Sequence, residues 1–151
     1  MEYSLVVESP VGRLTLGSDG DYLTEIRFGG DEKETEQCPV LHETARQLTE
    51  YFAGVRREFS IPLKLDGTEF QRSVWTALRS VPYGSTAAYG DIAARIGNPR
   101  ACRAVGSANN RNPIAIIVPC HRVVGVNGKL TGYAGGLPIK EFLLALERKY
   151  Q

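Results

Sequence analysis

The 151-residue sequence has few of the residues that build cross-linked or metal-clustered proteins. Its three cysteines, Cys38, Cys102 and Cys120, are odd in number and include no CxxC pair. Such a sparse set argues against both a disulfide framework and a zinc cluster. Reduced thiols are therefore expected.

The sequence also lacks a long hydrophobic run. Its longest purely aliphatic stretch, Ile114 to Val118, is far shorter than the ~18 apolar residues that a membrane span requires. Met1-Glu2-Tyr3 offers no basic stretch of the kind that opens a secretory signal. Because 42% of the residues are hydrophobic, the chain can still bury a real core. We expect a soluble, intracellular, cytoplasmic protein of one domain or two small ones.

The formal net charge of +1 is low for a protein that binds nucleic acid. The two parts of the chain differ, however. Residues 1–66 hold 7 Lys and Arg against 13 Asp and Glu, a net charge of −6, whereas residues 67–151 hold 11 against 4, a net charge of +7. This asymmetry is typical of contact with nucleic acid or membrane, and equally of an acidic face beside a basic one. Charge alone leaves both open.

Residues 1–66 predict a small antiparallel sheet followed by a helix. Segments rich in β-branched and aromatic residues, separated by turn residues, predict strands over Tyr3–Glu8, Arg13–Ser18 and Tyr22–Phe28. Residues 29–37 are polar and acidic, which predicts an exposed loop. Apolar residues then recur at helical spacing from Leu41 to Phe52.

From Gly67 on, the pattern changes to short helices. One is predicted around Phe70–Leu78 and a second over Tyr89–Ile96. Asn98 is a good N-cap, and Pro99 a good first residue, for a third helix that runs to about Asn109. The last two helices predict a helix-turn-helix, whose second helix usually meets DNA.

An aliphatic strand over Ile114–Val118 and a final helix over about Pro138–Arg148 complete the predicted elements. The whole pattern predicts an α/β (α+β) fold. Its first domain, residues 1–66, is a small antiparallel sheet with a helix. Its second, residues 67–151, is helical and contains a winged-helix-like helix-turn-helix.

A thiol and an imidazole are adjacent in the run Pro119-Cys120-His121-Arg122. Neighbouring residues on an extended chain point to opposite sides, so a helical or turn geometry, or a bridging water, is needed to join them. A free cysteine with a pKa of ~8.5 is mostly thiol at neutral pH, so nucleophilic work needs a base or a positive field. His121 and Arg122 could supply both. A buried structural cysteine beside a core histidine is the alternative, and composition alone favours it.

Other blocks of sequence accompany this run in a fixed order. They are GSTAAY at residues 84–89, GNPRACRAVG at 97–106, NP at 112–113, IIVPCHRVV at 116–124 and GYAGGL at 132–137. Together they resemble the O6-alkylguanine-DNA alkyltransferases, also called methylated-DNA-protein-cysteine methyltransferases. The resemblance covers roughly Thr68 to Glu147, and the first 66 residues are compatible with the family's less distinctive sheet domain.

The resemblance implies an enzyme that moves an alkyl group irreversibly from O6 of guanine to the sulfur of Cys120, once per molecule and without a cofactor. His121 would act through a water as the base, and Glu147 would orient the histidine. Asn112 would hold the turn before the active-site strand. Tyr89 would donate a proton or hydrogen bond to the guanine ring.

The resemblance also implies that the damaged base is flipped out of the duplex. Arg103 would fill the vacated stack, with Arg100 beside it on the recognition helix. The small residues Ala101 and Gly106 would allow close approach in a minor groove. The backbone carbonyls of Cys120 and Val123 would accept from the exocyclic amine of guanine. Further pocket positions are Tyr133, Ala134, Gly135 and Ala115.

Two positions depart from the family pattern. Ala134 stands where some members have serine, and Ala115 where some have proline, which predicts weaker reaction with benzyl-type adducts than with methyl adducts. Cys38 and His42 are the only remnants of the zinc site that some members carry. Since two ligands are too few, no metal is expected.

Three alternatives belong to other classes. A lesion sensor of the alkyltransferase-like kind would keep the arginine finger but lack the reactive cysteine. A winged-helix regulator would prefer an operator sequence, and a cysteine hydrolase would turn over many substrates. The expected partner is double-stranded DNA carrying O6-alkylguanine, met by a monomer that binds no membrane.

Overall fold

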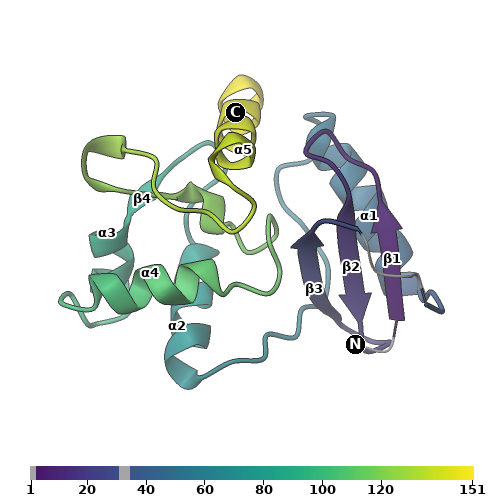
Figure 1. Ribbon diagram of the computed structural model, residues 1–151, viewed down its shortest axis with the longest axis horizontal. Coiled ribbons are helices and arrows are strands. Elements are labelled where there is room, and N and C mark those ends of the chain that lie inside the picture. Colours follow the sequence, from purple (N-terminus) through teal and green to yellow (C-terminus); the bar gives the residue numbers. More distant parts are fainter. Residues whose placement is uncertain (1–2, 31–34) are drawn as a thin grey trace. The chain divides into compact units, whose positions relative to one another are not determined.

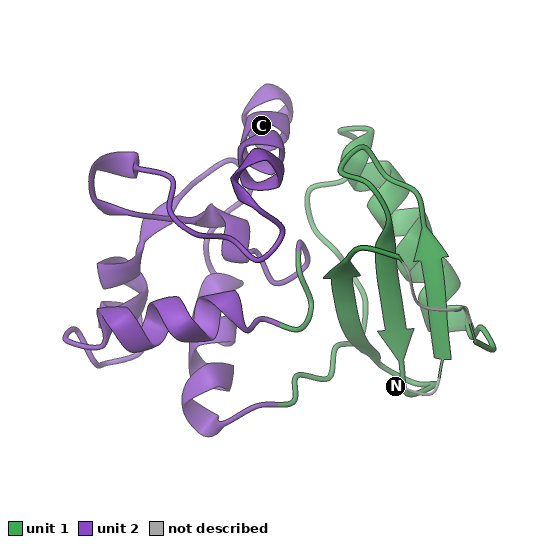
Figure 2. Ribbon diagram, viewed as in Figure 1, with its two compact units in different colours: residues 1–66, 113–115 green, residues 67–112, 116–151 purple. Residues whose placement is uncertain are grey.

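The computed structural model describes residues 3–30 and 35–151, which divide into two compact units (Figure 2). Unit 1 comprises Met1–Asp66 with Pro113–Ala115, and unit 2 comprises Gly67–Asn112 with Ile116–Gln151. The predicted mixed fold, with a small antiparallel sheet and several helices, is confirmed. Within the described ranges, no helix combines the length and the apolar character needed to cross a membrane. The predicted acidic loop over residues 29–37 falls partly on residues 31–34, outside the described residues.

Unit 1 is a three-stranded antiparallel sheet with one helix packed on it (Figure 1). Its strands are β1 (Tyr3–Val7), β2 (Leu14–Ser18) and β3 (Leu23–Phe28), in the order β1-β2-β3. Helix α1 (Pro39–Phe52) begins with a proline, whose fixed φ suits the first turn. Apolar side chains of the sheet and of α1 form the core, among them Leu14, Leu16, Leu41, Leu48 and Tyr51.

Two isolated bridges extend the pairing of β3. Leu23 bridges Leu63, and Ile26 bridges Ile114. The second bridge groups Pro113–Ala115 with unit 1, although the sequence predicts these residues in the second domain. The strand predicted over 114–118 is wrong. Only Ile114 pairs, and Ile116 takes a φ of 74°, which a β-branched residue rarely adopts and which ends the extended path.

Unit 2 is built on three helices, α2 (Glu69–Leu78), α3 (Tyr89–Arg95) and α4 (Cys102–Asn110). Thr68 and Gln71 form a capping box at the start of α2. The buried Trp75 joins α2 to α4, because its indole N–H donates to the carbonyl of Ala108 at 2.8 Å. Helices α3 and α4 are the predicted helix-turn-helix. Helix α5 (Leu137–Tyr150) closes the chain.

Helix α4 begins later than predicted. Asn98 does not cap α4; the residue at the N-cap is Ala101. Gly97, with a φ of 79°, ends α3, and the N–H of Asn98 still donates back to Ala93 of that helix at 2.9 Å. Asn98 therefore closes α3 and leaves the start of α4 to Cys102.

A short pair of parallel strands lies next to the region around Cys120. Strand β4 (Ala87–Ala88) pairs with β5 (Val123–Val124). The 3-10 turn η1 (Cys120–Arg122) comes directly before β5, and η2 (Val126–Gly128) follows it. The pairing brings Tyr89, the first residue of α3, to the level of the residues that follow Cys120.

Candidate active site

Cys120 lies at the start of a tight turn that buries its side chain. Its N–H donates to the carbonyl of Val118 at 2.8 Å, across Pro119 with φ −82° and ψ 65°. This is an inverse γ-turn, for which the fixed φ of proline is suited. The residue is only 4% exposed. The turn and the 3-10 geometry supply the bend that an extended Cys-His pair lacks.

Opposing influences act on the thiol. Burial raises the pKa of Cys120, while hydrogen bonds with the side chains of Asn112 and Tyr133 and the positive charge of Lys140 lower it. The Asn112 amide also donates to the carbonyl of Val118 at 2.7 Å. These three side chains favour the thiolate that burial disfavours.

His121 and Glu147 form a fully buried pair. The imidazole Nε2 lies 2.7 Å from the Oε2 of Glu147, and the side chains are 0% and 1% exposed. Burial lowers the pKa of His121, and the charges of Arg122 and Lys140 add to that effect against the opposing carboxylate. Burial thus favours the neutral imidazole. Its other nitrogen, Nδ1, is buried and has no hydrogen-bond partner in the part of the chain that the structure describes.

Arg122 holds the carboxylate from its other side. Its Nε donates to Oε1 of Glu147 at 2.8 Å, its Nη2 to Oε2 at 2.9 Å, and its Nη1 to the carbonyl of Val81 at 2.8 Å. Burial alone would raise the pKa of Glu147, but the bonds from His121 and Arg122 hold it well below its usual range. The sequence indicates Arg122 only as a source of positive field, not as the bidentate partner of Glu147.

Lys140 is a site residue that the sequence does not reveal directly. It is fully buried on α5, and its ammonium donates to the carbonyl of Val123 at 2.5 Å and to that of Thr131 at 3.4 Å. Burial lowers its pKa and the nearby Cys120 opposes that shift. One signal was available, because Lys140 and Glu147 lie two helical turns apart on one face of α5.

Tyr89 lies between α4 and the segment that precedes α5. Its hydroxyl is 2.8 Å from the Oγ1 of Thr131. On the α4 side, a Cβ added to Gly106 would lie 3.8 Å from the Tyr89 ring, which is ordinary contact. Gly106 thus faces Tyr89.

The two carbonyls predicted to read guanine already accept hydrogen bonds. Val123 accepts from Lys140, and Cys120 accepts from Asn109 Nδ2 at 3.4 Å and from the backbone N–H of Val123. A carbonyl oxygen has two lone pairs, so the Val123 carbonyl can accept another donor beside Lys140, whereas the Cys120 carbonyl would have to exchange one of its two partners to accept from guanine.

Sequence models of two related domains match almost the whole chain. Residues 69–149 match the 6-O-methylguanine DNA methyltransferase, DNA binding domain, and residues 1–65 match the 6-O-methylguanine DNA methyltransferase, ribonuclease-like domain. The chain belongs to the O6-methylguanine DNA methyltransferase family. The resemblance drawn from the sequence is confirmed, and an alkyl-transferring enzyme of DNA repair is favoured over a lesion sensor.

Individual methyltransferases agree along nearly their full length. The methylated-DNA-protein-cysteine methyltransferase of Methanosarcina acetivorans is 55% identical over 152 residues, covering 96% of this chain and 97% of its own. The crystal structure of Mycobacterium tuberculosis O6-methylguanine methyltransferase has a TM-score of 0.91 at 48% identity, covering 100% of this chain and 95% of its own. The crystal structure of Mycobacterium tuberculosis OGT in complex with DNA has a TM-score of 0.88 at 50% identity, covering 96% and 92%.

The helix-turn-helix lies within the part that matches the methyltransferase DNA binding domain. Arg100, in the turn before α4, and Arg103, in its first turn, are exposed, and Ala101 between them is half-buried. Their contacts with DNA stay predictions.

The remaining predicted pocket residues are distributed over both units. Ala134 is exposed and Gly135 half-buried, just before α5. Ala115 groups with unit 1, where its N–H donates to the carbonyl of Ile26 at 3.2 Å. Its predicted place in the methyltransferase pocket stays a prediction. Across residues 3–30 and 35–151, no three His, Cys, Asp or Glu side chains gather as a metal site requires.

Proposed function

We propose that this chain repairs alkylated DNA by moving the alkyl group from O6 of guanine onto Cys120, once per molecule. The observation that carries this proposal is the buried Cys120 thiol, next in sequence to a histidine held by a carboxylate, in a chain of the methyltransferase family. The proposed partner is double-stranded DNA with an O6-alkylguanine, met by a monomer.

The first step is ionisation of the thiol. Glu147 is a carboxylate and can only accept, so Nε2 of His121 carries the hydrogen and Nδ1 is the basic nitrogen. We propose that Nδ1 takes the proton of Cys120 through a water. The contacts of Asn112 and Tyr133 with the thiol support the thiolate that forms.

The second step is substitution at the alkyl carbon. The sulfur lone pair forms the new S–C bond, and the C–O6 bond breaks with its electron pair left on guanine. Tyr89 donates to the ring as this charge grows. Overall, one proton leaves the thiol and one reaches the guanine, so the reaction needs no cofactor. The S-alkylated protein is the end product.

Recognition of guanine is assigned to the backbone around Cys120. The carbonyls of Cys120 and Val123 would accept from the exocyclic amine, which adenine lacks at that position. The backbone amide of Ala134 would serve O6, with Gly135 beside it. Ala134 lacks the serine hydroxyl, and Ala115 the hydrophobic proline ring, that some family members have at these positions, so methyl adducts should react faster than benzyl adducts. Equal rates for the two would contradict this assignment.

A base inside a duplex is out of reach, so the lesion must be flipped out at a cost of a few kcal/mol. The exposed Arg103 on α4 is the proposed finger, with Arg100 on the phosphates and Ala101 and Gly106 allowing close approach. Arg103→Ala should slow transfer from duplex DNA but leave the reaction with free O6-methylguanine base unchanged, since a free base needs no flipping. An unchanged duplex rate would contradict the finger role.

The central experiment counts transferred groups. The protein is incubated with excess methylated duplex and weighed, and the expected gain is one methyl per chain, on the peptide that contains Cys120. Cys120→Ser, which keeps the DNA surface, should bind DNA and gain nothing. Binding without a mass gain by the natural protein would indicate a lesion sensor, and many turnovers per molecule would indicate a hydrolase.

A further inference from the structure

Thr131 contacts the proposed proton donor, and the sequence motifs assign it no role. Its Oγ1 lies 2.8 Å from the hydroxyl of Tyr89, although the two residues are 42 positions apart. The contact is partly shielded from solvent. Such a bond between residues on separate segments fixes the direction in which the Tyr89 hydroxyl can point.

Thr131 is itself held in place from two other directions. Its carbonyl accepts from the buried Lys140 at 3.4 Å. A Cβ added to Gly125 would lie 3.0 Å from the Thr131 methyl, so glycine at 125 leaves the room that this methyl occupies. The N–H of Gly125 donates to the carbonyl of Lys129 at 2.7 Å and closes the turn between them. With its methyl and carbonyl fixed, a β-branched side chain has few directions left for its hydroxyl.

We propose that Thr131 is a positioning residue for the transfer, resting on the role proposed above for Tyr89. Thr131 donates its hydrogen to the Tyr89 oxygen, which leaves the hydrogen of Tyr89 free for the guanine ring. A hydroxyl that accepts one hydrogen bond becomes a better donor of the next, and the bond stabilises the negative charge that grows on the Tyr89 oxygen as its proton is drawn away. Thr131 touches no reacting atom and acts through Tyr89.

A matched set of substitutions separates the hydroxyl from the methyl. Thr131→Val keeps the shape and removes the hydroxyl, and it should slow single-turnover methyl transfer from duplex DNA about 5- to 10-fold, the effect of one well-placed hydrogen bond. Thr131→Ser keeps the hydroxyl and should react at close to the natural rate. The affinity for methylated duplex should be unchanged in both variants. Thr131 orients the hydroxyl of Tyr89 and is not part of the proposed DNA-binding surface.

A double-mutant cycle with Tyr89→Phe decides the proposal. The Thr131→Val substitution should slow transfer in the natural background and have no effect once Tyr89→Phe is present. Equal slowing in both backgrounds, a natural rate for Thr131→Val, or a slow Thr131→Ser would each overturn it. A Tyr89→Phe protein that reacts at the natural rate would overturn it together with the role of Tyr89. Failure of the proposed function is seen separately, as a natural protein that gains no methyl at all.

Discussion

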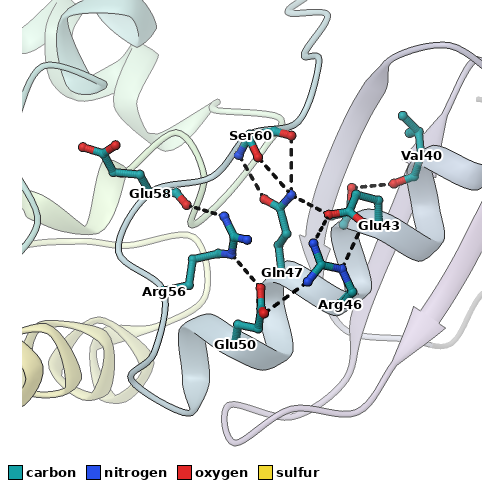
Figure 3. A network of polar contacts seen from close by, with 9 residues as sticks. Val40, Glu43, Arg46, Gln47, Glu50, Arg56, Glu58 and Ser60 are labelled. Carbon is teal, nitrogen blue, oxygen red and sulfur yellow. Dashed lines mark hydrogen bonds and ion pairs between the residues drawn. The ribbon is translucent and has the colours of Figure 1, made fainter.

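Two networks of ion pairs in this molecule consist of the same kinds of side chain but differ in their exposure to solvent. In unit 1, Glu50 bridges two arginines, with Nη1 of Arg46 at 3.1 Å and Nε of Arg56 at 2.8 Å, and Arg46 also binds Glu43 (Figure 3). In unit 2, Glu147 bridges Arg122 and His121. In each network, one carboxylate lies between two nitrogen-containing side chains.

The difference is access of water. The side chains of Arg46, Glu43, Glu50 and Arg56 are 55%, 42%, 33% and 23% exposed, against 9% or less for the members of the Glu147 network. Hydrogen bonds from Arg46 and Gln47 still lower the pKa of Glu43 to about 2, yet solvent screens exposed pairs. A buried pair, by contrast, cannot lose one member without leaving an uncompensated charge inside the protein. The network in unit 1 connects α1 to Ser60 through Gln47, and the buried one holds His121, the proposed base.

The largest effect is expected from breaking the buried network. Glu147→Gln should lower the free energy of unfolding by about 3–5 kcal/mol, because the Arg122 charge is left without a counter-charge. Methyl transfer should fall as well, since an amide has one acceptor oxygen where the carboxylate has two, and Arg122 then competes with Nε2 of His121 for it. Urea unfolding measures the loss, and Glu50→Gln is the matched control. An equal loss in both variants would mean that burial is not the distinction.

Lys140→Met should have the next largest effect. Removing its buried donor leaves the carbonyls of Val123 and Thr131 without it, which costs about 1–3 kcal/mol. The charge of Lys140 lowers the pKa of Cys120, so its removal raises that pKa and should move the rate-pH profile of methyl transfer to higher pH. Lys149→Met, on the exposed side of the same helix, should leave the profile in place. An unshifted profile for Lys140→Met would contradict the electrostatic role.

A smaller effect is expected from acid. The pKa of His121 is lowered in the folded protein, so below about pH 6.5, the ordinary histidine value, the unfolded chain binds a proton that the folded chain does not. Stability should therefore fall as pH decreases from about 6.5, by at most about 1.4 kcal/mol per pH unit for this one group. Below about pH 4.3, the lowered pKa of Glu147 adds a further loss.

The two histidines of the chain provide the test of that slope. His121→Gln should remove the fall in unfolding midpoint between pH 7 and pH 5. His42→Gln, at an exposed position on α1, should keep it. If the pH dependence of the unfolding midpoint disappeared in His42→Gln instead, the responsible group would lie in unit 1, and the prediction for His121 would be contradicted.

The smallest effect is expected in the exposed network. Glu43→Gln should lower the unfolding midpoint slightly in dilute buffer, and the difference should vanish in 1 M salt, where the Debye length is about 3 Å. A loss that salt does not change would show that the network of Figure 3 behaves as a buried one.

Much of this protein can be derived from its sequence because the relevant signals are local. Alternating β-branched and aromatic residues predict the three strands of unit 1. The helical spacing of apolar residues predicts α1, α2, α3 and α5 to within a few residues. Cys120 and His121 are adjacent, and their neighbouring blocks identify the family. Glu147 enters only through that resemblance, since it lies 26 residues from His121.

What the tertiary structure decides depends on contacts between distant residues. Arg122 meets Glu147 across 25 positions, and Lys140 meets Val123 across 17. Ile114 joins β3 and Ile116 turns away at positive φ, so an aliphatic run that predicts a strand becomes one bridge and a bend. Periodicity reports which face of a segment is buried, but not which partner it is buried against. Cys120 could therefore be identified as the candidate nucleophile from the sequence, whereas the charged partners that hold His121, its proposed base, required the fold.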